Sequence, residues 1–294
     1  MNVFLFGAGA SYGSVDCRPH LPPLGTQLFD VLEGLGGTTS SLSEDQKFAF
    51  KQKFEPAMAD LYATSSRKAY ALLREMGSYF SEFKPGNKNL YIDLISHLLV
   101  SGARFTLATT NYDLLIEQSI QAVGSTYDHE PGRTTGAVML YKIHGSCNFL
   151  PVMRGISMKG CTFTGPGAAM EVAIRVAWPN EVRAFCQQQD SVAPSIAMYT
   201  TGKEVKICPQ FVLNQLLLWQ SLSSGAARNF VIGLKVEPVD SHIWDVLAQS
   251  PGDLIYVGLE RDLDEWKDSV GKRNAYWVGA RFDEALPLIK AKLL

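Results

Sequence analysis

The chain has 294 residues, of which 46% are hydrophobic and 19% are charged. This composition fits a globular protein with a sizeable core and excludes a chain that is disordered throughout. Lys and Arg number 27 against 29 Asp and Glu, so the formal net charge is −2. Because no general basic surplus exists, we predict no direct nucleic-acid partner.

The sequence contains no run of eighteen apolar residues, so we expect no membrane span. The first residues carry no basic segment and reach Gly7 after a short apolar run. That pattern predicts a buried strand rather than a signal peptide, and a cytoplasmic protein. The five cysteines are widely spaced without a C-x-x-C pair, and the five histidines are scattered. We therefore expect no disulfide framework and no metal.

The first part of the chain predicts one strand and then a helical segment. Residues 2–6 form a short apolar run that ends in glycine, which is typical of a buried strand in a parallel sheet. After a proline-rich loop, residues 26–102 have mainly helical patterns, and we interpret them as a helical insertion. The helix signals are apolar spacing at 26–35, a capping box at Ser43–Gln46, and helical patterns at 66–83 and 90–100.

The remainder alternates between strands and helices, apart from one irregular region. Residues 146–208 have mixed signals and many glycines, and we predict a lid or small subdomain inserted there, with a hairpin at 196–208. The expected strands are 103–108, 138–143, 229–233, 254–258 and 276–278. The expected helices include 114–122, 210–223 and 240–249. Together they predict one α/β domain over 1–294, a Rossmann-like doubly wound parallel sheet with helical additions and a small inserted subdomain.

Three short motifs follow predicted strands: Gly7–Ser11, Thr109–Asp113 and His144-Gly145. In a doubly wound sheet, ligands bind at the carboxyl ends of the strands. Each motif alone has a structural explanation, as a helix entry, an Asx-turn or helix cap, and a loop. Their shared placement nevertheless predicts a binding site.

The glycine motif departs from the common phosphate-binding patterns. The fingerprint G-x-G-x-x-G fails because Tyr12 occupies its last position, and no Gly-Lys pair of a P-loop follows. We predict that the missing Cβ atoms of Gly7 and Gly9 let a phosphate approach the backbone N–H groups.

In this order and spacing, the three motifs resemble those of the sirtuins, in particular the bacterial sirtuin-like domains that consume NAD in phage defence. The stretch Val231–Lys235 followed by Asp240–Trp244 is similar to the late strand and helix of that family. The resemblance extends from Met1 to about Val257 and implies that NAD is the substrate.

The resemblance also implies roles for the matched residues. Asn111 would position the nicotinamide ribose and an attacking water, Asp113 would be an acid beside the nicotinamide pocket, and His144 would be the base on the ribose hydroxyls. These three are the predicted catalytic residues. The predicted cofactor-binding residues are Gly7, Ala8, Gly9, Ala10, Ser11, Thr110, Gly233 and Lys235.

The sequence departs from the sirtuin deacylases at several positions. Their glutamine before the catalytic asparagine is Thr110 here, and their Gly-Thr-Ser run is Gly233-Leu234-Lys235. Their four-cysteine zinc module is missing. These departures weaken deacylation more than NAD cleavage, because Asn111 and His144 remain.

The leading hypothesis is an NAD+ hydrolase that serves as the effector of an anti-phage system. The alternatives are a non-catalytic NAD or ADP-ribose sensor or assembly module, and an NAD-dependent deacylase or ADP-ribosyltransferase. We expect a homo-oligomer or a partner such as a HerA-type ATPase or an Argonaute-like protein.

His242 is interpreted as a helix cap. An exposed aromatic patch is predicted among Phe48, Phe50, Phe54, Tyr62, Tyr70, Tyr79, Phe80 and Phe83.

Overall fold

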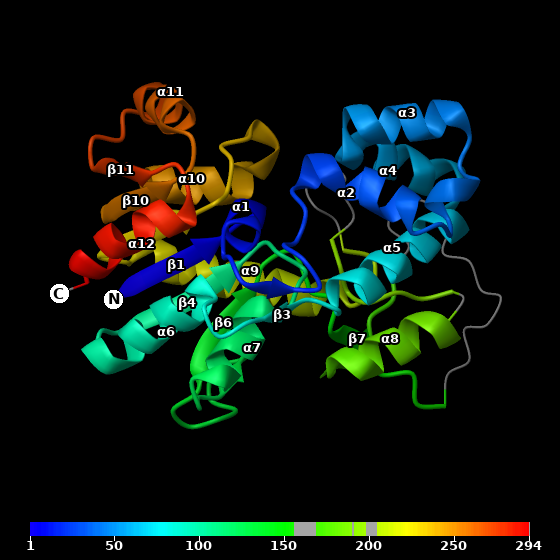
Figure 1. Cartoon of the computed structure of the whole chain (residues 1–294), viewed down its shortest axis with the longest axis horizontal. Coiled ribbons are helices and arrows are strands. Elements are labelled where there is room, and N and C mark those ends of the chain that lie inside the picture. Colours follow the sequence, from blue (N-terminus) through cyan, green and yellow to red (C-terminus); the bar gives the residue numbers. More distant parts are fainter. Residues whose placement is uncertain (156–168, 190, 198–204, 294) are drawn as a thin grey trace.

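The computed structural model describes residues 1–155, 169–189, 191–197 and 205–293 (Figure 1). At its centre lies a seven-stranded sheet with the order β11-β10-β9-β1-β4-β6-β5, in which every neighbouring pair is parallel. This confirms the predicted Rossmann-like α/β class. The strands are β1 (Asn2–Phe6), β4 (Phe105–Thr109), β5 (Tyr127–Asp128), β6 (Val138–Lys142), β9 (Arg228–Ile232), β10 (Asp253–Val257) and β11 (Ala275–Gly279).

Helices cover both faces of the sheet, which is why its strands are continuously apolar rather than alternating. Phe4 and Phe6 of β1 belong to the core on one face, and Val3 and Leu5 belong to the core on the other. The first face is covered by α6 (Leu90–Ser101), α7 (Leu115–Ala122) and α12 (Phe282–Ala291). The second is covered by α9 (Pro209–Ser224), α10 (Ser241–Gln249) and α11 (Glu260–Val270).

The strand order reverses next to β1. From β1 the chain builds the sheet outward through β4 and β6, and it then returns to place β9 on the other side of β1. The residue Phe6 is in register with Thr109 of β4 and with Ile232 of β9. The loops that follow these three strands therefore begin at the same edge of the sheet, which is the edge where ligands bind in this architecture.

A helical lobe lies beside the sheet (Figure 1). It contains α2 (Gly25–Gly34), α3 (Glu44–Gln52), α4 (Phe54–Thr64) and α5 (Ser66–Phe80), and α5 packs against α8 (Pro179–Gln188). Smaller elements are α1 (Ala8–Tyr12), the strand pairs β2 (Cys17–Arg18) with β3 (Lys84–Pro85) and β7 (Phe149–Pro151) with β8 (Ile174–Val176), and the 3-10 turns η1 (Thr39–Ser41) and η2 (Pro238–Asp240). The predicted insertions at 26–102 and 146–208 stay predictions.

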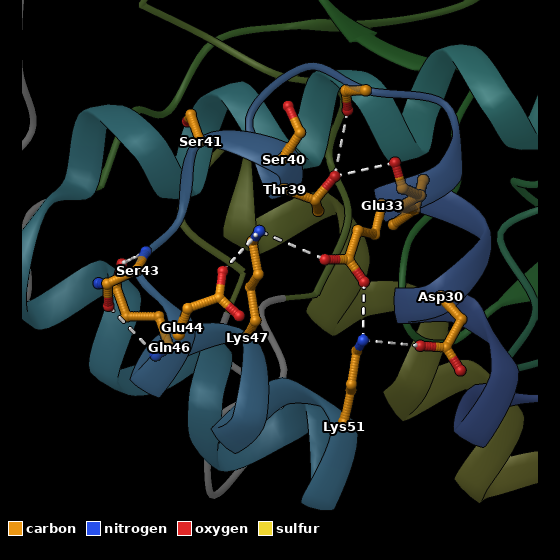
Figure 2. Close-up of polar contacts among 12 residues, drawn as sticks. Asp30, Glu33, Thr39, Ser40, Ser41, Ser43, Glu44, Gln46, Lys47 and Lys51 are labelled. Atoms are coloured by element: carbon orange, nitrogen blue, oxygen red, sulfur yellow. Dashed lines mark hydrogen bonds and ion pairs between the residues drawn. The ribbon is translucent and has the colours of Figure 1, made fainter.

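Ion pairs join α2 to α3 at the surface, and a capping box begins α3 (Figure 2). Glu33 of α2 lies 3.4 Å from Lys47 and 2.8 Å from Lys51, both on α3. The Ser43 side chain accepts from the Gln46 backbone amide, and the Gln46 side chain bonds back to Ser43, as the capping-box pattern predicts. Ion pairs near a protein surface contribute little each. The buried rings of Phe29 of α2 and Phe50 of α3, which stack on each other, add apolar burial to the contact between the two helices.

The prediction of an exposed aromatic patch in the helical segment is wrong. Of the eight aromatic residues, Phe48 is exposed and Tyr62 is partly buried, whereas Phe50, Phe54, Tyr70, Tyr79, Phe80 and Phe83 are buried. The rings contact one another in small groups, and in one of these Phe29 and Phe50 are stacked at 5.0 Å between centroids. The lobe needs these aromatics because its helices build a core of their own.

Trp219, Trp244 and Trp266 are buried in the core on the second face, whereas Trp277 is 40% exposed. The turn of the hairpin predicted at 196–208 lies outside the described residues, and its two described ends pair with other segments. Ile196 bridges Gly145, and Ile207 bridges Met170. Among the helices of the described chain, none is long and apolar enough to cross a membrane.

Candidate functional site

The loop after β1 and the loop after β9 are in direct backbone contact. The Gly9 amide donates to the Gly233 carbonyl at 2.8 Å, and the Gly7 amide donates to the Ile232 carbonyl at 2.9 Å. A Cβ on Gly7 would lie 2.5 Å from the Gly233 oxygen, and one on Gly9 would lie 2.9 Å from it. The space that we attributed to an approaching phosphate is therefore occupied by the backbone of the β9 loop.

The same contacts limit which amides of the glycine loop can bind a ligand. The N–H groups of Gly7, Gly9 and Ala10 already donate within the protein, the last to the Gly7 carbonyl at 2.9 Å. Ala8 is the first residue of α1, where an N–H group has no partner within the helix. A pyrophosphate at this loop would thus rely on the Ala8 amide more than on the amides of the glycines.

Ser11 and Asn111 connect the first motif to the second. Asn111 follows β4, and its Nδ2 donates to the Gly7 carbonyl and to the Ser11 Oγ, both at 2.9 Å. Ser11 is buried and also contacts the Tyr91 hydroxyl at 3.0 Å. Because a carbonyl can only accept, the contact with Gly7 determines which side of the Asn111 amide carries its hydrogens.

The bonding of Asn111 limits what its side chain can do. Both hydrogens of the amide are used within the protein, so Oδ1 is the atom through which Asn111 can accept a bond from a water or a hydroxyl. We expected this residue to hold a water by donating and accepting at once; the structure leaves it the accepting role. The backbone of Asn111 is held as well, because its amide donates to the Thr109 Oγ1 at 2.9 Å.

Thr110 and Asp113 have structural partners at the same strand end. The Thr110 amide donates to the Phe6 carbonyl at 3.0 Å, which continues the pairing of β4 with β1. Asp113 is buried, and its Oδ1 accepts from the amide of Leu115, the first residue of α7, at 3.1 Å in an Asx-type turn. Burial raises the pKa of the Asp113 carboxyl, and the nearby Lys142 charge opposes that shift. The catalytic role of Asp113 stays a prediction, because this turn accounts for its placement.

His144 lies in the loop that follows β6, and Asn111 lies in the loop that follows the neighbouring strand β4. Thr109 and Lys142 are register partners, so Asn111 and His144 each lie two residues beyond the same rung of the ladder. The His144 carbonyl accepts from the Ala197 amide at 2.9 Å. Gly145 follows with a φ of 79°, and a Cβ there would lie 2.1 Å from the Ser195 oxygen. The segment 195–197 thus fixes the backbone at this strand end.

The ring of His144 meets a second histidine that the sequence analysis assigned to helix capping. His144 is 5% exposed, and its Nε2 lies 2.9 Å from the Nε2 of His242 in the first turn of α10. The Asp240 carboxylate completes the cluster, since one donor atom from each of the three residues lies within 4.8 Å of the others. Two histidines and a carboxylate are ligand types that divalent transition metals accept. The 2.9 Å separation is, however, an ordinary hydrogen-bond length.

Sequence reasoning missed His242 because the contact joins segments that are 98 residues apart. A D-x-H pattern at a predicted helix start fits a cap equally well. The signal that could have identified His242 was its position in the chain. Asp240 and His242 follow β9, and the end of β9 lies beside the end of β1.

Lys235 extends from the β9 loop into solvent. Its side chain is 62% exposed and forms an ion pair with Glu237. The hydrogen bond to Glu237 raises the pKa of the Lys235 ammonium group. Contact of Lys235 with a nucleotide phosphate stays a prediction. A cavity of about 310 Å³ lies apart from all these residues, between β7, β8 and α8, and includes Met153, Arg175 and Phe185 among its lining residues.

Comparison with known proteins agrees with this architecture. No protein-family model matches the chain, and no curated protein matches it. Among solved structures, one from a study of sirtuin substrate affinity is 17% identical with a TM-score of 0.52, covering 100% of this chain and 93% of that one. A mutant Sir2 homologue in complex with 2′-O-acetyl ADP-ribose is 16% identical with a TM-score of 0.52, covering 99% and 89%.

A second mutant Sir2 homologue, in complex with ADP-ribose, is 14% identical with a TM-score of 0.50, covering 99% of this chain and 90% of that one. At sequence identities this low, the structural similarity shows a shared fold and nothing finer. The part of the chain that the structure describes has the fold of these sirtuin structures.

Proposed function

We propose that this protein binds NAD+ and hydrolyses it to nicotinamide and ADP-ribose. Solved structures with the same fold include Sir2 homologues in complex with ADP-ribose and with 2′-O-acetyl ADP-ribose. The observation that carries the proposal is the Asn111 amide, oriented by Gly7 and Ser11 at the sheet edge where His144 ends the adjacent strand.

The reaction needs little covalent chemistry from the protein. Breaking the bond between C1′ and nicotinamide gives the ribose oxocarbenium character, and nicotinamide leaves as a neutral molecule. A water then forms the new bond to C1′ and loses a proton. Fixed dipoles and correct positioning are the main aids to such a reaction. Asn111 would accept from the water or a ribose hydroxyl through Oδ1, and His144 would accept from a ribose hydroxyl.

A non-catalytic sensor is the second candidate, and one observation favours it. Both amide hydrogens of Asn111 stabilise the packing of the glycine loop, so the residue has a structural role even without a reaction. In that case the protein would bind NAD+ or ADP-ribose and return it unchanged. Deacylation has less support, since the sequence has no C-x-x-C pair that could begin the four-cysteine zinc module of the sirtuin deacylases.

The deciding experiment measures nicotinamide release from NAD+ alone by the purified chain. We expect release by the wild type and at least a hundredfold loss in Asn111→Ala and His144→Ala. The matched control is Asn214→Ala on the exposed side of α9, which should retain wild-type turnover. Binding of NAD+ without cleavage would favour the sensor. Undiminished turnover in folded Asn111→Ala and His144→Ala variants would contradict the assignment of the site.

We also propose that this activity serves bacterial anti-phage defence in the cytoplasm and is controlled by self-association or by a partner, such as a HerA-type ATPase or an Argonaute-like protein. An unregulated NAD+ hydrolase would exhaust the cofactor of its own cell. The test is light scattering together with nicotinamide release over a range of protein concentrations. A monomer with full activity at every concentration would contradict control by self-association.

A further inference from the structure

We infer that His242 is a positioning residue for His144, and that the two imidazoles act as a hydrogen-bonded pair assisted by Asp240. The inference rests on the proposed function, because it gives His144 its role on the ribose. Its basis is the contact between the two Nε2 atoms at 2.9 Å, with the ring planes inclined by 42° and the ring centroids 5.1 Å apart.

The chain holds His242 firmly at this place. It lies in the first turn of α10, and Ile243 and Trp244 anchor that turn in the core on the α9–α11 face of the sheet. The His242 carbonyl accepts from the Gln220 Nε2 of α9 at 2.9 Å, which ties α10 to its neighbour. Because both the helix and its first turn are tethered, the contact between the imidazoles requires little ordering when a ligand binds.

The pairing restricts the protonation states of both rings. When both are neutral, one facing nitrogen must carry a hydrogen and the other must not, so the two rings adopt complementary tautomers. His242 thereby determines which nitrogen of His144 is protonated, as well as the orientation of the ring. A base that must accept a proton from a hydroxyl depends on both properties.

Asp240 adds a negative charge beside the pair. It is 8% exposed, and its carboxylate belongs to the cluster whose donor atoms lie within 4.8 Å of one another. When a ribose hydroxyl transfers its proton to His144, the pair becomes singly positive. A carboxylate at this distance stabilises that charge more than solvent would in a mostly buried place. The three residues therefore form one unit at the junction of the β6 and β9 loops.

The kinetic test uses three variants on one helix. We expect His242→Ala to lower the rate of nicotinamide release roughly 10- to 100-fold while the dissociation constant of ADP-ribose changes less than about threefold. His242→Gln should recover part of the rate, because a glutamine amide can hydrogen-bond the His144 ring. Free imidazole added to His242→Ala should also raise the rate. Asp245→Ala, on the exposed face of α10, is the control and should match the wild type.

A second measurement does not depend on turnover. Nitrogen NMR of the histidine side chains reports the tautomer of His144, and we expect it to change in His242→Ala and to stay unchanged in Asp245→Ala. If the wild type releases no nicotinamide, the proposed function fails, and this spectrum alone decides whether the pair exists. An unchanged His144 tautomer in His242→Ala overturns the inference.

Two other results would also overturn the inference. One is active wild-type enzyme with full turnover in His242→Ala. The other is turnover that a chelator abolishes and Zn2+ or Co2+ restores, because the three residues would then hold a metal instead of acting as a hydrogen-bonded pair.

Discussion

Gly233 and Ala10 touch through their backbones: a Cβ built on Gly233 would lie 2.0 Å from the Ala10 amide nitrogen. Gly233 also has a φ of 67°, which side chains rarely adopt. The contact joins the loops after β1 and β9, which carry seven of the eleven residues that the sequence predicts for the site. The integrity of this edge of the sheet therefore depends on one glycine.

Gly233→Ala should lower the free energy of unfolding by about 3 kcal/mol or more, because it combines backbone strain with a clash against Ala10 that only a backbone shift can relieve. Gly36→Ala is the matched control. Gly36 has a φ of 85° but open space around it, so its substitution should cost about 1 kcal/mol. Denaturant unfolding measures both, and equal costs would show that the contact between the loops contributes nothing.

The same packing prevents a substitution at Gly9 from testing ligand binding alone. A Cβ on Gly9 would lie 2.9 Å from the Gly233 oxygen, so Gly9→Val would disturb the fold before it could exclude a phosphate. Loss of NAD-dependent thermal stabilisation in that variant would not identify the ligand site. We expect Gly9→Val to unfold at a lower temperature than the wild type in the absence of any nucleotide.

Asn111→Asp should reduce nicotinamide release at least a hundredfold and also destabilise the fold. The substitution replaces the Nδ2 that donates to Gly7 by a carboxylate oxygen, which faces the carbonyl oxygen of Gly7. A buried acceptor against a buried acceptor costs about 1–3 kcal/mol. The paired measurements are unfolding by denaturant and turnover. Wild-type stability in Asn111→Asp would show that the amide is not held as described.

The buried ion pair of Lys142 and Glu117 stabilises the fold next to the site. Their side chains are 0% and 3% exposed, the charged groups lie 3.1 Å apart, and the Lys142 ammonium also donates to the Asp113 carbonyl at 2.6 Å. Lys142→Met should cost about 3–5 kcal/mol, because it leaves the Glu117 carboxylate buried without compensation. The double variant Lys142→Met with Glu117→Leu should recover much of this loss. A double variant as unstable as the single one would contradict the argument.

His129 makes the stability of the protein depend on pH. It is buried, its Nδ1 donates to the Leu140 carbonyl at 2.7 Å, and burial lowers its pKa from 6.5 to about 4. Because the folded pKa lies below the unfolded one, this contribution is fully present above pH 6.5. It is lost progressively as the pH falls from 6.5 towards 4.

We therefore expect His129 alone to remove about 2 kcal/mol of stability between pH 8 and pH 5. The measurement is denaturant unfolding at both values. His129→Phe should remove that part of the pH dependence and keep the ring contacts with Tyr127 and Phe149. His20→Gln, at an exposed position, should leave it unchanged. A pH dependence that is the same in His129→Phe as in the wild type would show that His129 does not titrate as argued.

Local pattern was sufficient to predict the sheet apart from its short edge strand β5, which the sequence analysis missed. The apolar runs of β1, β4, β6, β9 and β10 each end in a glycine or a polar motif, and helical spacing follows all of them except β6. This alternation allows little besides a doubly wound parallel architecture. The placement of the motifs at one edge follows from the same rule, because parallel strands all end on the same side. The sequence alone therefore predicted that Asn111 and His144 lie at the same edge of the sheet.

Tertiary structure alone decided the features that depend on contacts between distant segments. Most aromatic residues of α3 to α5 are buried, because those helices form a lobe with α8. Neither spacing nor composition distinguishes a ring that faces another helix from one, such as Phe48, that faces solvent. Gly9 and Gly233 are needed because two loops more than two hundred residues apart in the chain share one space. His242 contacts His144 only because the chain returns to place β9 beside β1. The spacing of residues in the sequence does not indicate this return.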